Sequence, residues 1–267
     1  NGTGVALVTG CASGIGLHLA GELAARGWRL VATDVNEPAL ESRARERGWD
    51  PSRVLVERLD VRDPARWEEV VGLAFERWDR LDVLMNVAGY LMSGYVHETT
   101  PAEVDLHLDV NAKGVIHGTR VAARALVRQG HGHIINVASL AGVAPIPGLS
   151  IYSASKFAVR GFSLAAAHEL RSRGVYVTVV CPDSVATPLL DRQRDREAAA
   201  FMFSGARILT TEEVGRAILG TLESKPLEVV LPRSRGLLAK LGSAVPAVGL
   251  LLGDPMKRRG LARQKRV

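Results

Sequence analysis

Residues 5–16 read Val-Ala-Leu-Val-Thr-Gly-Cys-Ala-Ser-Gly-Ile-Gly, an apolar run that leads into three glycines. Apolar positions at helical spacing follow in residues 17–26, so the segment predicts a strand, a tight turn and a helix. Gly10 permits the turn, Gly14 lets backbone amides approach a phosphate, and Gly16 lets the helix pack close to the strand. Because a helix N-terminus attracts anions, the segment predicts a site for the pyrophosphate of a dinucleotide.

The remainder of the chain repeats this alternation of strand and helix. It predicts a Rossmann-like doubly wound parallel sheet of about seven strands, with helices on both faces and the ligand at the carboxyl ends of the strands. A length of 267 residues, with 47% apolar residues and no Gly/Ser-rich linker, favours a single domain of the α/β class. Further strands are expected at residues 29–34, 54–58, 81–86, after 131–133, at 176–181 and at 227–231, and helices at 37–47, 66–77, 111–129, 152–173 and from near 211.

An acidic residue ends the second expected strand. Asp34 lies about twenty residues after the glycine loop, where a carboxylate accepts hydrogen bonds from the adenosine ribose and repels a 2′-phosphate. The cofactor predicted from this residue is therefore NAD, in preference to NADP.

Tyr152 and Lys156 are four residues apart in an expected helix, so both side chains project from one face. A phenol has an ordinary pKa of about 10, and lowering it to about 7 needs about 4 kcal/mol of preferential stabilisation of the anion. A close ammonium together with an oxidised nicotinamide can supply this. The pair predicts a tyrosine that acts as acid and base on alcohols and ketones.

Taken together, these residues resemble the short-chain dehydrogenase/reductase family in its ordinary subtype, from about Gly4 to Leu231. The glycine loop at 9–16, the segment Asn86-Val-Ala-Gly89 and the set Ser139, Tyr152 and Lys156 carry the resemblance. The cofactor contacts that it implies are Gly10, Ser13, Gly14, Ile15, Gly16, Asp34, Asp60, Val61, Asn86, Ala88, Gly89, Tyr152, Lys156, Pro182, Val185 and Thr187.

The resemblance also implies roles for the catalytic residues. Tyr152 gives or takes the hydroxyl proton, and Ser139 hydrogen-bonds the substrate oxygen. Lys156 binds the nicotinamide ribose and biases the phenol, and Asn111 holds a water that links the lysine to solvent. Two positions depart from the family pattern. Val87 replaces an asparagine. Pro182-Asp183 stands where Pro-Gly is usual, so Asp183 replaces a glycine and adds a charge beside the nicotinamide.

Residues 183–210 correspond to a mobile lid in the family. Its second half is apolar, and we hypothesise that it helps to form an apolar pocket for a lipophilic secondary alcohol or ketone. Alternatively, the apolar residues serve only to dock the lid against the rest of the protein. The expected substrate contacts are Ser139, Tyr152, Leu91, Met92, Val143, Ile146, Pro147, Leu149, Phe201 and Phe203, with Met202, Ile208 and Leu209 in the same apolar half of the lid.

The positive charge of the chain is confined to its end. Residues 233–267 contain nine Lys or Arg and one acid, giving +8, whereas residues 1–232, the expected catalytic domain, total −2. The apolar run at 237–252 is interrupted by Lys240 and Pro246 and is too short to span a membrane. We expect this C-terminal extension to fold over the substrate pocket or a neighbouring subunit, with peripheral contact to an anionic membrane as an alternative. Nucleic-acid binding is not expected, because no aromatic residues accompany the charge.

The remaining residues that could carry other chemistry are interpreted structurally. Cys11 and Cys181 are far apart in sequence and fit packing in a reducing cytoplasm. His131-Gly-His133 is expected in a solvated loop, with no metal site. The leading interpretation is an NAD-dependent dehydrogenase or ketone reductase, cytoplasmic and, by analogy, a homodimer or homotetramer paired through helices 111–129 and 152–173. The alternatives are an NADPH-linked carbonyl reductase and a non-catalytic nucleotide sensor or membrane-associated protein on the same fold.

Overall fold

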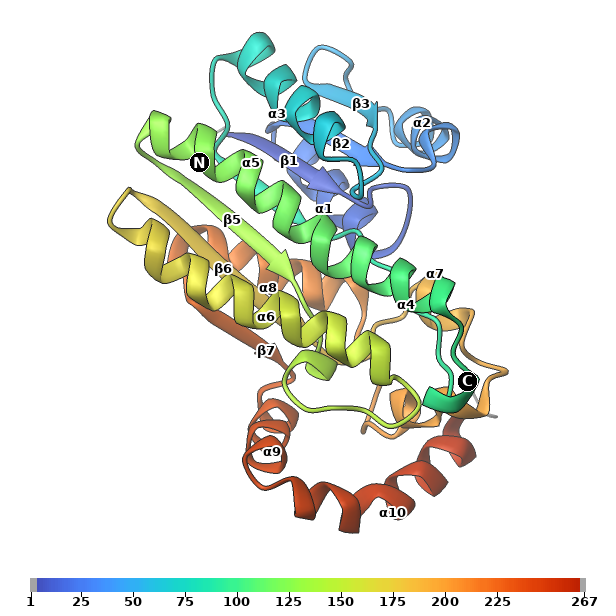
Figure 1. The fold of residues 1–267 in the computed structure, drawn as a ribbon. Coiled ribbons are helices and arrows are strands. Elements are labelled where there is room, and N and C mark those ends of the chain that lie inside the picture. The colour runs from blue at the N-terminus through green and yellow to red at the C-terminus, as the bar shows by residue number, and fades with distance from the viewer. Residues whose placement is uncertain (1–3, 265–267) are drawn as a thin grey trace.

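The structure, a computed structural model, describes residues 4–264. Seven strands form one parallel sheet in the order β3-β2-β1-β4-β5-β6-β7. The predicted α/β fold with a single Rossmann-like domain is confirmed, and the reversal of strand order next to β1 creates the place where such sheets bind ligands (Figure 1). The strands are β1 (Val5–Thr9), β2 (Arg29–Asp34), β3 (Val54–Arg58), β4 (Val83–Asn86), β5 (Gly132–Val137), β6 (Val175–Pro182) and β7 (Glu228–Leu231).

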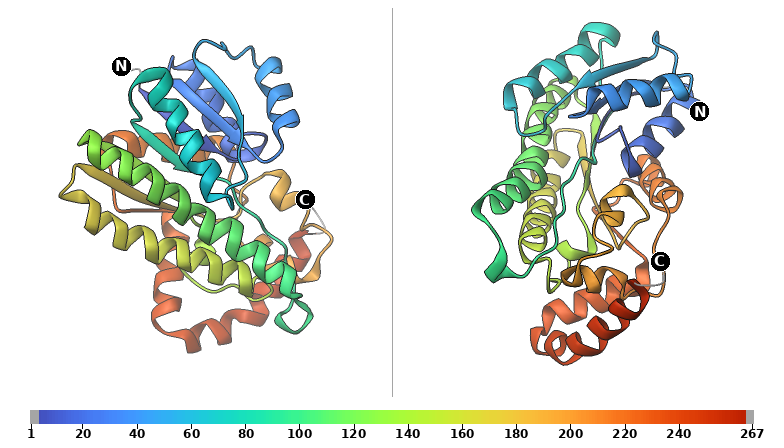
Figure 2. Two further views of the ribbon diagram at one scale, coloured as in Figure 1. Left: turned by 45° about the horizontal axis from the view of Figure 1, so that its top comes forward. Right: turned by 90° about the vertical axis from the view of Figure 1, so that its right-hand side faces the viewer.

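Helices cover both faces of the sheet, as the side view in Figure 2 shows. One face carries α3 (Pro64–Trp78), α5 (Gly114–Gln129) and α6 (Ser150–Arg171), and the other carries α1 (Gly14–Ala25), α2 (Glu37–Glu46) and α8 (Thr211–Ser224). Because side chains alternate along a strand, Leu7 of β1 packs with Trp67 of α3, whereas Val8 packs in the cluster of Leu19 and Ile218. Two apolar cores therefore hold the sheet rigid between its helices.

Local signals set several helix boundaries. The Asp63 side chain accepts hydrogen bonds from the first turn of α3, and Thr210 forms a capping box with Glu213 at the start of α8. Gly130 ends α5 in the left-handed conformation. The observed β4 is two residues shorter than predicted, because the Leu81 amide bonds to the side chain of Gln129 and not to a neighbouring strand.

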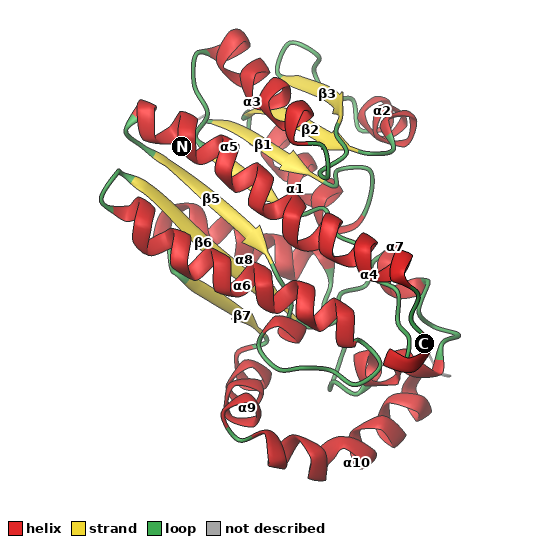
Figure 3. Ribbon diagram, viewed as in Figure 1, coloured by secondary structure: helices red, strands yellow, loops and turns green. Residues whose placement is uncertain are grey.

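Short helices surround the carboxyl ends of the strands. They are η1 (Val96–Glu98), α4 (Pro101–His107), η2 (Leu108–Lys113), η3 (Leu140–Gly142), α7 (Pro188–Asp191) and η4 (Glu197–Phe203). Segment 183–210 thus contains α7 and η4 joined by loops (Figure 3). The sequence spacing predicted a regular helix from residue 111, but η2 is a π-helix that joins α4 to α5.

The C-terminal extension forms two helices, α9 (Arg233–Ala244) and α10 (Pro246–Gln264), with the break next to Pro246. α10 returns to lie along η4, within the segment 183–210 that corresponds to the lid (Figure 1). Lys257 pairs with Glu197 at 2.7 Å, and Arg263 donates to the carbonyl of Gly205. In the part of the chain that the structure describes, no helix has both the length and the apolar composition to cross a membrane. The side chains of residues 246 and 248–252, and the basic residues 265 and 266, lie outside the described residues.

Candidate active site

A cavity of about 690 Å³ opens along the carboxyl ends of the strands. The glycine loop and Asp34 line one end of it, and Ser139, Tyr152 and Lys156 line the other. The sequence thus placed two distant groups of residues correctly in one crevice. It extends from the end of β2 to the start of α6, along the edge of the sheet where dinucleotides bind in folds of this type.

The three glycines of the loop lie where a side chain would collide with the backbone or with a neighbouring segment. Gly10 and Gly14 have positive φ angles of +77° and +57°. A Cβ on Gly16 would lie 2.1 Å from the Gly10 carbonyl oxygen, and one on Gly14 would lie 3.1 Å from the Thr187 methyl group. The loop is a cradle of bare backbone at the N-terminus of α1, and it fits a pyrophosphate.

Asp34 ends β2, and one of its carboxylate oxygens contacts the glycine loop. One oxygen accepts the Ala12 amide and the other the Asn36 amide, each at 2.9 Å. Each oxygen can accept a further hydrogen bond, so the residue both stabilises the loop and offers acceptors to a ribose.

Other expected cofactor contacts differ in how they face the cavity. Asp60 and Val61 line it, but the Asp60 carboxylate is held by Arg62 at 2.6 Å, and this pairing lowers its pKa. Ala88 and Gly89 line it as well. The Asn86 side chain does not: it is buried beneath and donates to Asn136 at 2.8 Å.

The two residues after Asn86 form part of the floor of the crevice. The amides of Val87 and Ala88 both donate to the Thr9 hydroxyl at 3.0 Å. The ends of β1 and β4 are joined by this hydroxyl, which fixes the floor of the cavity. Sequence reasoning had not assigned Thr9 a role.

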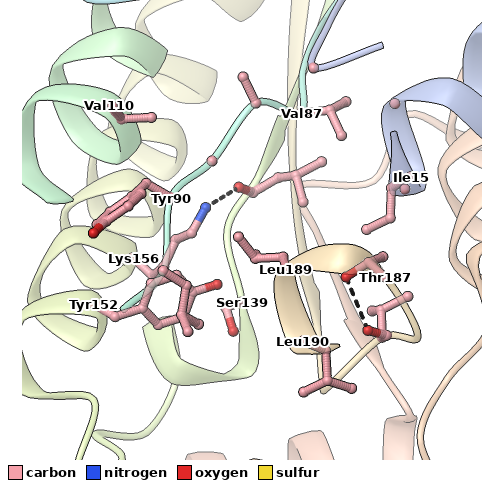
Figure 4. Close-up of a pocket in the computed structure, with 18 of the residues that line it drawn as sticks. Ile15, Val87, Tyr90, Val110, Ser139, Tyr152, Lys156, Thr187, Leu189 and Leu190 are labelled. Carbon is pink, nitrogen blue, oxygen red and sulfur yellow. Dashed lines mark hydrogen bonds between the residues drawn. The ribbon is translucent and has the colours of Figure 1, made fainter. Parts of the chain in front are cut away.

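Tyr152 and Lys156 project from one face of α6 as predicted, next to Ser139 at the end of β5 (Figure 4). The Lys156 Nζ atom lies 5.7 Å from the centroid of the Tyr152 ring and donates to the Val137 carbonyl at 3.0 Å. The Ser139 hydroxyl accepts the Ala141 amide at 3.1 Å. Both α6 side chains are almost fully buried, with exposed fractions of 9% and 3%.

Burial dominates the acid–base properties of this pair. It raises the pKa of Tyr152 to about 12, although a hydrogen bond with Ser139 acts in the opposite direction. Burial thus acts against the predicted lowering, which requires an oxidised nicotinamide as well as the ammonium, because removal from water penalises the phenolate. The pKa of Lys156 is lowered to about 8 for the same reason.

Asn111 lies behind this pair, within the π-helix, and is fully buried. Its amide donates to the Tyr90 carbonyl at 2.8 Å and to the Ser155 hydroxyl at 3.0 Å, and its oxygen accepts the Tyr90 amide at 2.7 Å. A Cβ on Gly89 would lie 3.4 Å from this oxygen and 3.7 Å from Lys156 Nζ. Asn111 does not line the cavity itself but faces the lysine across the bare backbone of Gly89.

The end of β6 and the segment after it form a further side of the cavity. Pro182, Val185 and Thr187 line the cavity as expected. Asp183 also lines it, and its carboxylate pairs at 2.9 Å with Arg235 of α9. Burial raises the pKa of Asp183, and the guanidinium opposes that rise. The sequence revealed the unusual aspartate but not the arginine that meets it from 52 residues further along.

The apolar half of the cavity contains part of the expected substrate set. Leu91, Met92, Ile146, Leu149 and Phe201 line it. Val143 and Phe203 are buried in separate apolar clusters, and Pro147 is exposed. Met202, expected together with Phe201 and Phe203, also lines it, whereas Ile208 and Leu209 pack in apolar clusters. Sequence reasoning missed two lining residues, Leu189 and Leu190.

Neither the histidine pair nor the cysteines form a site. His131 is exposed, but His133 is buried in β5, hydrogen-bonded to Thr178 at 2.8 Å, so the expected solvated loop is wrong for His133. Burial lowers the pKa of His133 to about 4. Cys11 and Cys181 are both buried and free. Among the described residues, no cluster of His, Cys, Asp or Glu could hold a metal ion.

Comparison with known proteins agrees with this geometry. The sequence profile of the short chain dehydrogenases matches residues 4–198. The chain is 33% identical over 217 residues to the 3-oxoacyl-(acyl-carrier-protein) reductase FabG of Thermotoga maritima, covering 80% of this chain and 88% of that one. It is 32% identical over 218 residues to the NADP-dependent 3-hydroxy acid dehydrogenase YdfG of Salmonella typhi, covering 80% and 87%.

A solved structure gives the same result. The short chain dehydrogenase/reductase of Burkholderia phymatum in complex with NAD superposes with a TM-score of 0.83 at 27% identity, covering 92% of this chain and 95% of that chain. The crevice that holds its glycine cradle, Asp34 and the Ser139–Tyr152–Lys156 set is therefore part of a known enzyme architecture. The chain belongs to the short chain dehydrogenase family of NAD(P)-dependent oxidoreductases that act on CH-OH groups.

Proposed function

We propose that the protein is an NAD-dependent dehydrogenase or reductase that transfers hydride between the nicotinamide and a lipophilic secondary alcohol or ketone. The observation that carries the proposal is the meeting of Ser139, Tyr152 and Lys156 at the apolar end of a crevice whose other end is the glycine cradle. The nicotinamide, when bound, supplies or accepts the hydride. The chain's own residues hold the substrate and move its proton.

In the direction of ketone reduction, Tyr152 is the proton donor. Its raised pKa keeps the phenol protonated at neutral pH, and the phenol proton passes to the substrate oxygen as that oxygen gains charge. Ser139 donates a second hydrogen bond to the same oxygen. In the direction of alcohol oxidation, the phenolate must accept the proton, and the positive charges of Lys156 and an oxidised nicotinamide both favour that anion.

Asn111 and Lys156 form the expected route for the proton to solvent. The Asn111 oxygen and the lysine ammonium both lie close to Gly89: a Cβ on this glycine would be 3.4 Å from the oxygen and 3.7 Å from the ammonium. A water that bridges the two polar groups would link the lysine to Asn111. The two hydrogen bonds between Asn111 and the Tyr90 backbone keep the asparagine oxygen in place for that role.

Asp34 supports NAD as the cofactor. Its carboxylate is anchored by two amides and retains acceptor capacity for both ribose hydroxyls. A 2′-phosphate at the same place would bring two anions together in a partly buried site. The adjoining Val35 is exposed and apolar and provides no cation to offset that repulsion.

The pocket wall supports a lipophilic substrate. Leu91, Ile146 and Leu149 approach from the β4 and β5 ends, and Leu189, Leu190, Phe201 and Met202 approach from the proposed lid, segment 183–210. Figure 4 shows Leu189 projecting toward the space above Ser139 and Tyr152. An apolar wall of this extent favours a substrate that loses apolar surface to water on binding.

Two measurements test the proposal. Titration of the purified protein with NADH and with NADPH by fluorescence should give the tighter dissociation constant for NADH. A panel of secondary alcohols of graded chain length, assayed with NAD, should show a KM that falls as the chain lengthens. Tighter binding of NADPH would favour the carbonyl reductase alternative, and turnover confined to small polyols would rule out the lipophilic substrate.

The C-terminal extension retains a surface that the lid does not cover. Leu237, Leu238, Leu241 and Val245 form an exposed apolar stripe at helical spacing on α9. Peripheral attachment of this stripe to an anionic membrane remains our secondary proposal. Flotation with anionic vesicles tests it, and an active protein that stays in the dense fraction would refute it.

Assembly into a homodimer or homotetramer through α5 and α6 is likewise proposed. Both helices lie side by side on one face of the sheet (Figure 1). Light scattering on the eluting peak of a sizing column would give the mass in solution, and a mass of one chain at working concentration would overturn this proposal.

A further inference from the structure

An ion pair joins the reaction site to the C-terminal extension. Asp183 follows Pro182, whose carbonyl lies 3.5 Å from the Ser139 hydroxyl. Its carboxylate meets Arg235 Nη1 at 2.9 Å, and the two side chains are only 10% and 19% exposed. Both residues line the same cavity as Tyr152.

A carboxylate at this depth needs a partner. Removing a charge from water costs several kcal/mol unless an opposite charge and further hydrogen bonds compensate it. The groups that act on the Asp183 carboxyl are the Arg235 guanidinium and the Ser184 amide, and both favour its ionised form. Asp183 therefore depends on a cation, and α9, which lies outside the sheet, supplies it as Arg235.

Arg235 also reaches the proposed lid. Its Nη2 atom donates to the Ser204 hydroxyl at 3.1 Å, directly after η4. The lid is tied to the same place by the Ser184 hydroxyl, which donates to the Met202 carbonyl at 2.7 Å. One guanidinium from α9 thus contacts two other segments, the residue after β6 and the residue after η4.

Gly205 makes room for this arrangement. A Cβ there would lie 2.1 Å from Arg235 Nη1 and 3.3 Å from Asp183 Oδ2. Any side chain at position 205 would displace the guanidinium from the carboxylate. The three residues form one packed unit, in which Gly205 admits Arg235 and Arg235 neutralises Asp183.

We propose that Arg235, supplied by the C-terminal extension, is a positioning residue of the reaction site: it neutralises Asp183 beside the nicotinamide end of the crevice and fixes the lid over the substrate half. The inference rests on the proposed function for what the site does. The C-terminal extension then contributes a residue to the wall of the active site.

The test separates the two contributions with three variants. Arg235→Met leaves Asp183 without its cation and removes the tie to Ser204. Asp183→Asn combined with Arg235→Met restores neutrality but not the tie. Arg233→Met is the matched control, because Arg233 lies on the same helix and is exposed. Melting temperatures are measured first to check that each variant folds. If Arg235→Met does not fold, the neutral double variant is used to test the tie to the lid.

Two readouts need no substrate. Trypsin cleaves after arginine, and the lid contains Arg192, Arg194, Arg196 and Arg207. We expect Arg235→Met and the double variant to be cleaved in the lid roughly tenfold faster than wild type, which corresponds to about 1.4 kcal/mol. We expect the NADH dissociation constant to rise in Arg235→Met and to return to the wild-type value in the double variant.

With the best alcohol from the panel, KM should rise roughly tenfold in both variants while kcat changes less, because the lid holds substrate. The proposal is overturned by lid cleavage and NADH affinity that stay at wild-type values in Arg235→Met, or by Arg233→Met giving the same changes. If wild type turns over no alcohol or ketone, the proposed function fails, whereas cleavage and NADH binding still decide the role of Arg235.

Discussion

The ammonium of Lys156 lies 5.7 Å from the centre of the Tyr152 ring, and both side chains are buried in the same wall of the crevice. Burial acts on the two groups in opposite ways: the pKa of the phenol is raised to about 12, and that of the ammonium is lowered to about 8. Both shifts favour the neutral forms. The protein thus holds a proton donor ready for reduction and depends on added positive charge to make it a base.

Replacing Tyr152 with Phe should remove the proton donor while keeping the ring in place. We expect kcat to fall by about 10²- to 10⁴-fold, the usual contribution of a positioned acid or base. NADH affinity should change little. The matched control is Tyr90→Phe, a second phenol in the cavity lining, which should keep most activity. Full turnover by Tyr152→Phe would show that another group carries the proton.

Lys156→Met should stabilise the fold at neutral pH while abolishing most activity. The folded-state pKa of about 8 is below the ordinary 10.5, so below pH 8 the folded state pays for a buried charge. This cost is about 3 kcal/mol, partly offset by the hydrogen bond to Val137. Between pH 8 and 10.5 the unfolded chain binds more protons, so the stability of wild type rises with pH through this window.

The advantage of Lys156→Met should therefore shrink as the pH rises from 8 to about 10. Urea unfolding of both proteins at several pH values measures this difference. A gap in stability that does not change with pH would mean that the lysine is not held at a lowered pKa.

The sequence predicted best what depends on local pattern. Glycines between an apolar run and a helix led to the loop at 9–16, and the four-residue spacing placed Tyr152 and Lys156 on one face. Asp34 was found because it ends a strand, and Asp60 was assigned by the family resemblance. Such features need only the strand and helix periods and the rule that parallel strands present their carboxyl ends on one edge.

Features that depend on distant packing could not be predicted. No periodic pattern in the sequence indicates the strand register that buries Asn86 against Asn136. The same holds for the π-helix in which Asn111 is buried. The depth of Tyr152, which sets the sign of its pKa shift, follows from the whole surrounding fold. The sequence did not single out Arg235, because the extension contains many basic residues. Only the tertiary structure shows which of them pairs with Asp183.

Asp34→Asn should narrow the discrimination between the two dinucleotides. The amide keeps an acceptor oxygen but loses the charge that repels a 2′-phosphate. We expect the ratio of the NADPH to the NADH dissociation constant to fall by roughly tenfold, about 1.4 kcal/mol. Damage to the loop through Ala12 weakens both cofactors alike, so the ratio isolates the charge. A ratio equal to that of wild type would assign the selectivity elsewhere.

Among the contacts between α10 and the lid, two should differ in strength. The Gln264 side chain is buried and donates to the Gln193 and Arg196 carbonyls at 3.1 and 2.8 Å. The Lys257–Glu197 pair is solvent-exposed. Removing a partner from buried carbonyls costs about 1–3 kcal/mol, whereas an exposed ion pair contributes about 0–1 kcal/mol.

Gln264→Ala should therefore accelerate tryptic cleavage in the lid and raise the KM for substrate, and Lys257→Met should change both by less than threefold, about 0.6 kcal/mol. Added salt should remove the effect of Lys257→Met, because exposed charges are screened, but not that of Gln264→Ala. If Lys257→Met loosened the lid more than Gln264→Ala, the extension would be held by charge and not by its buried amide, and the packing of α10 against the lid would depend on ionic strength.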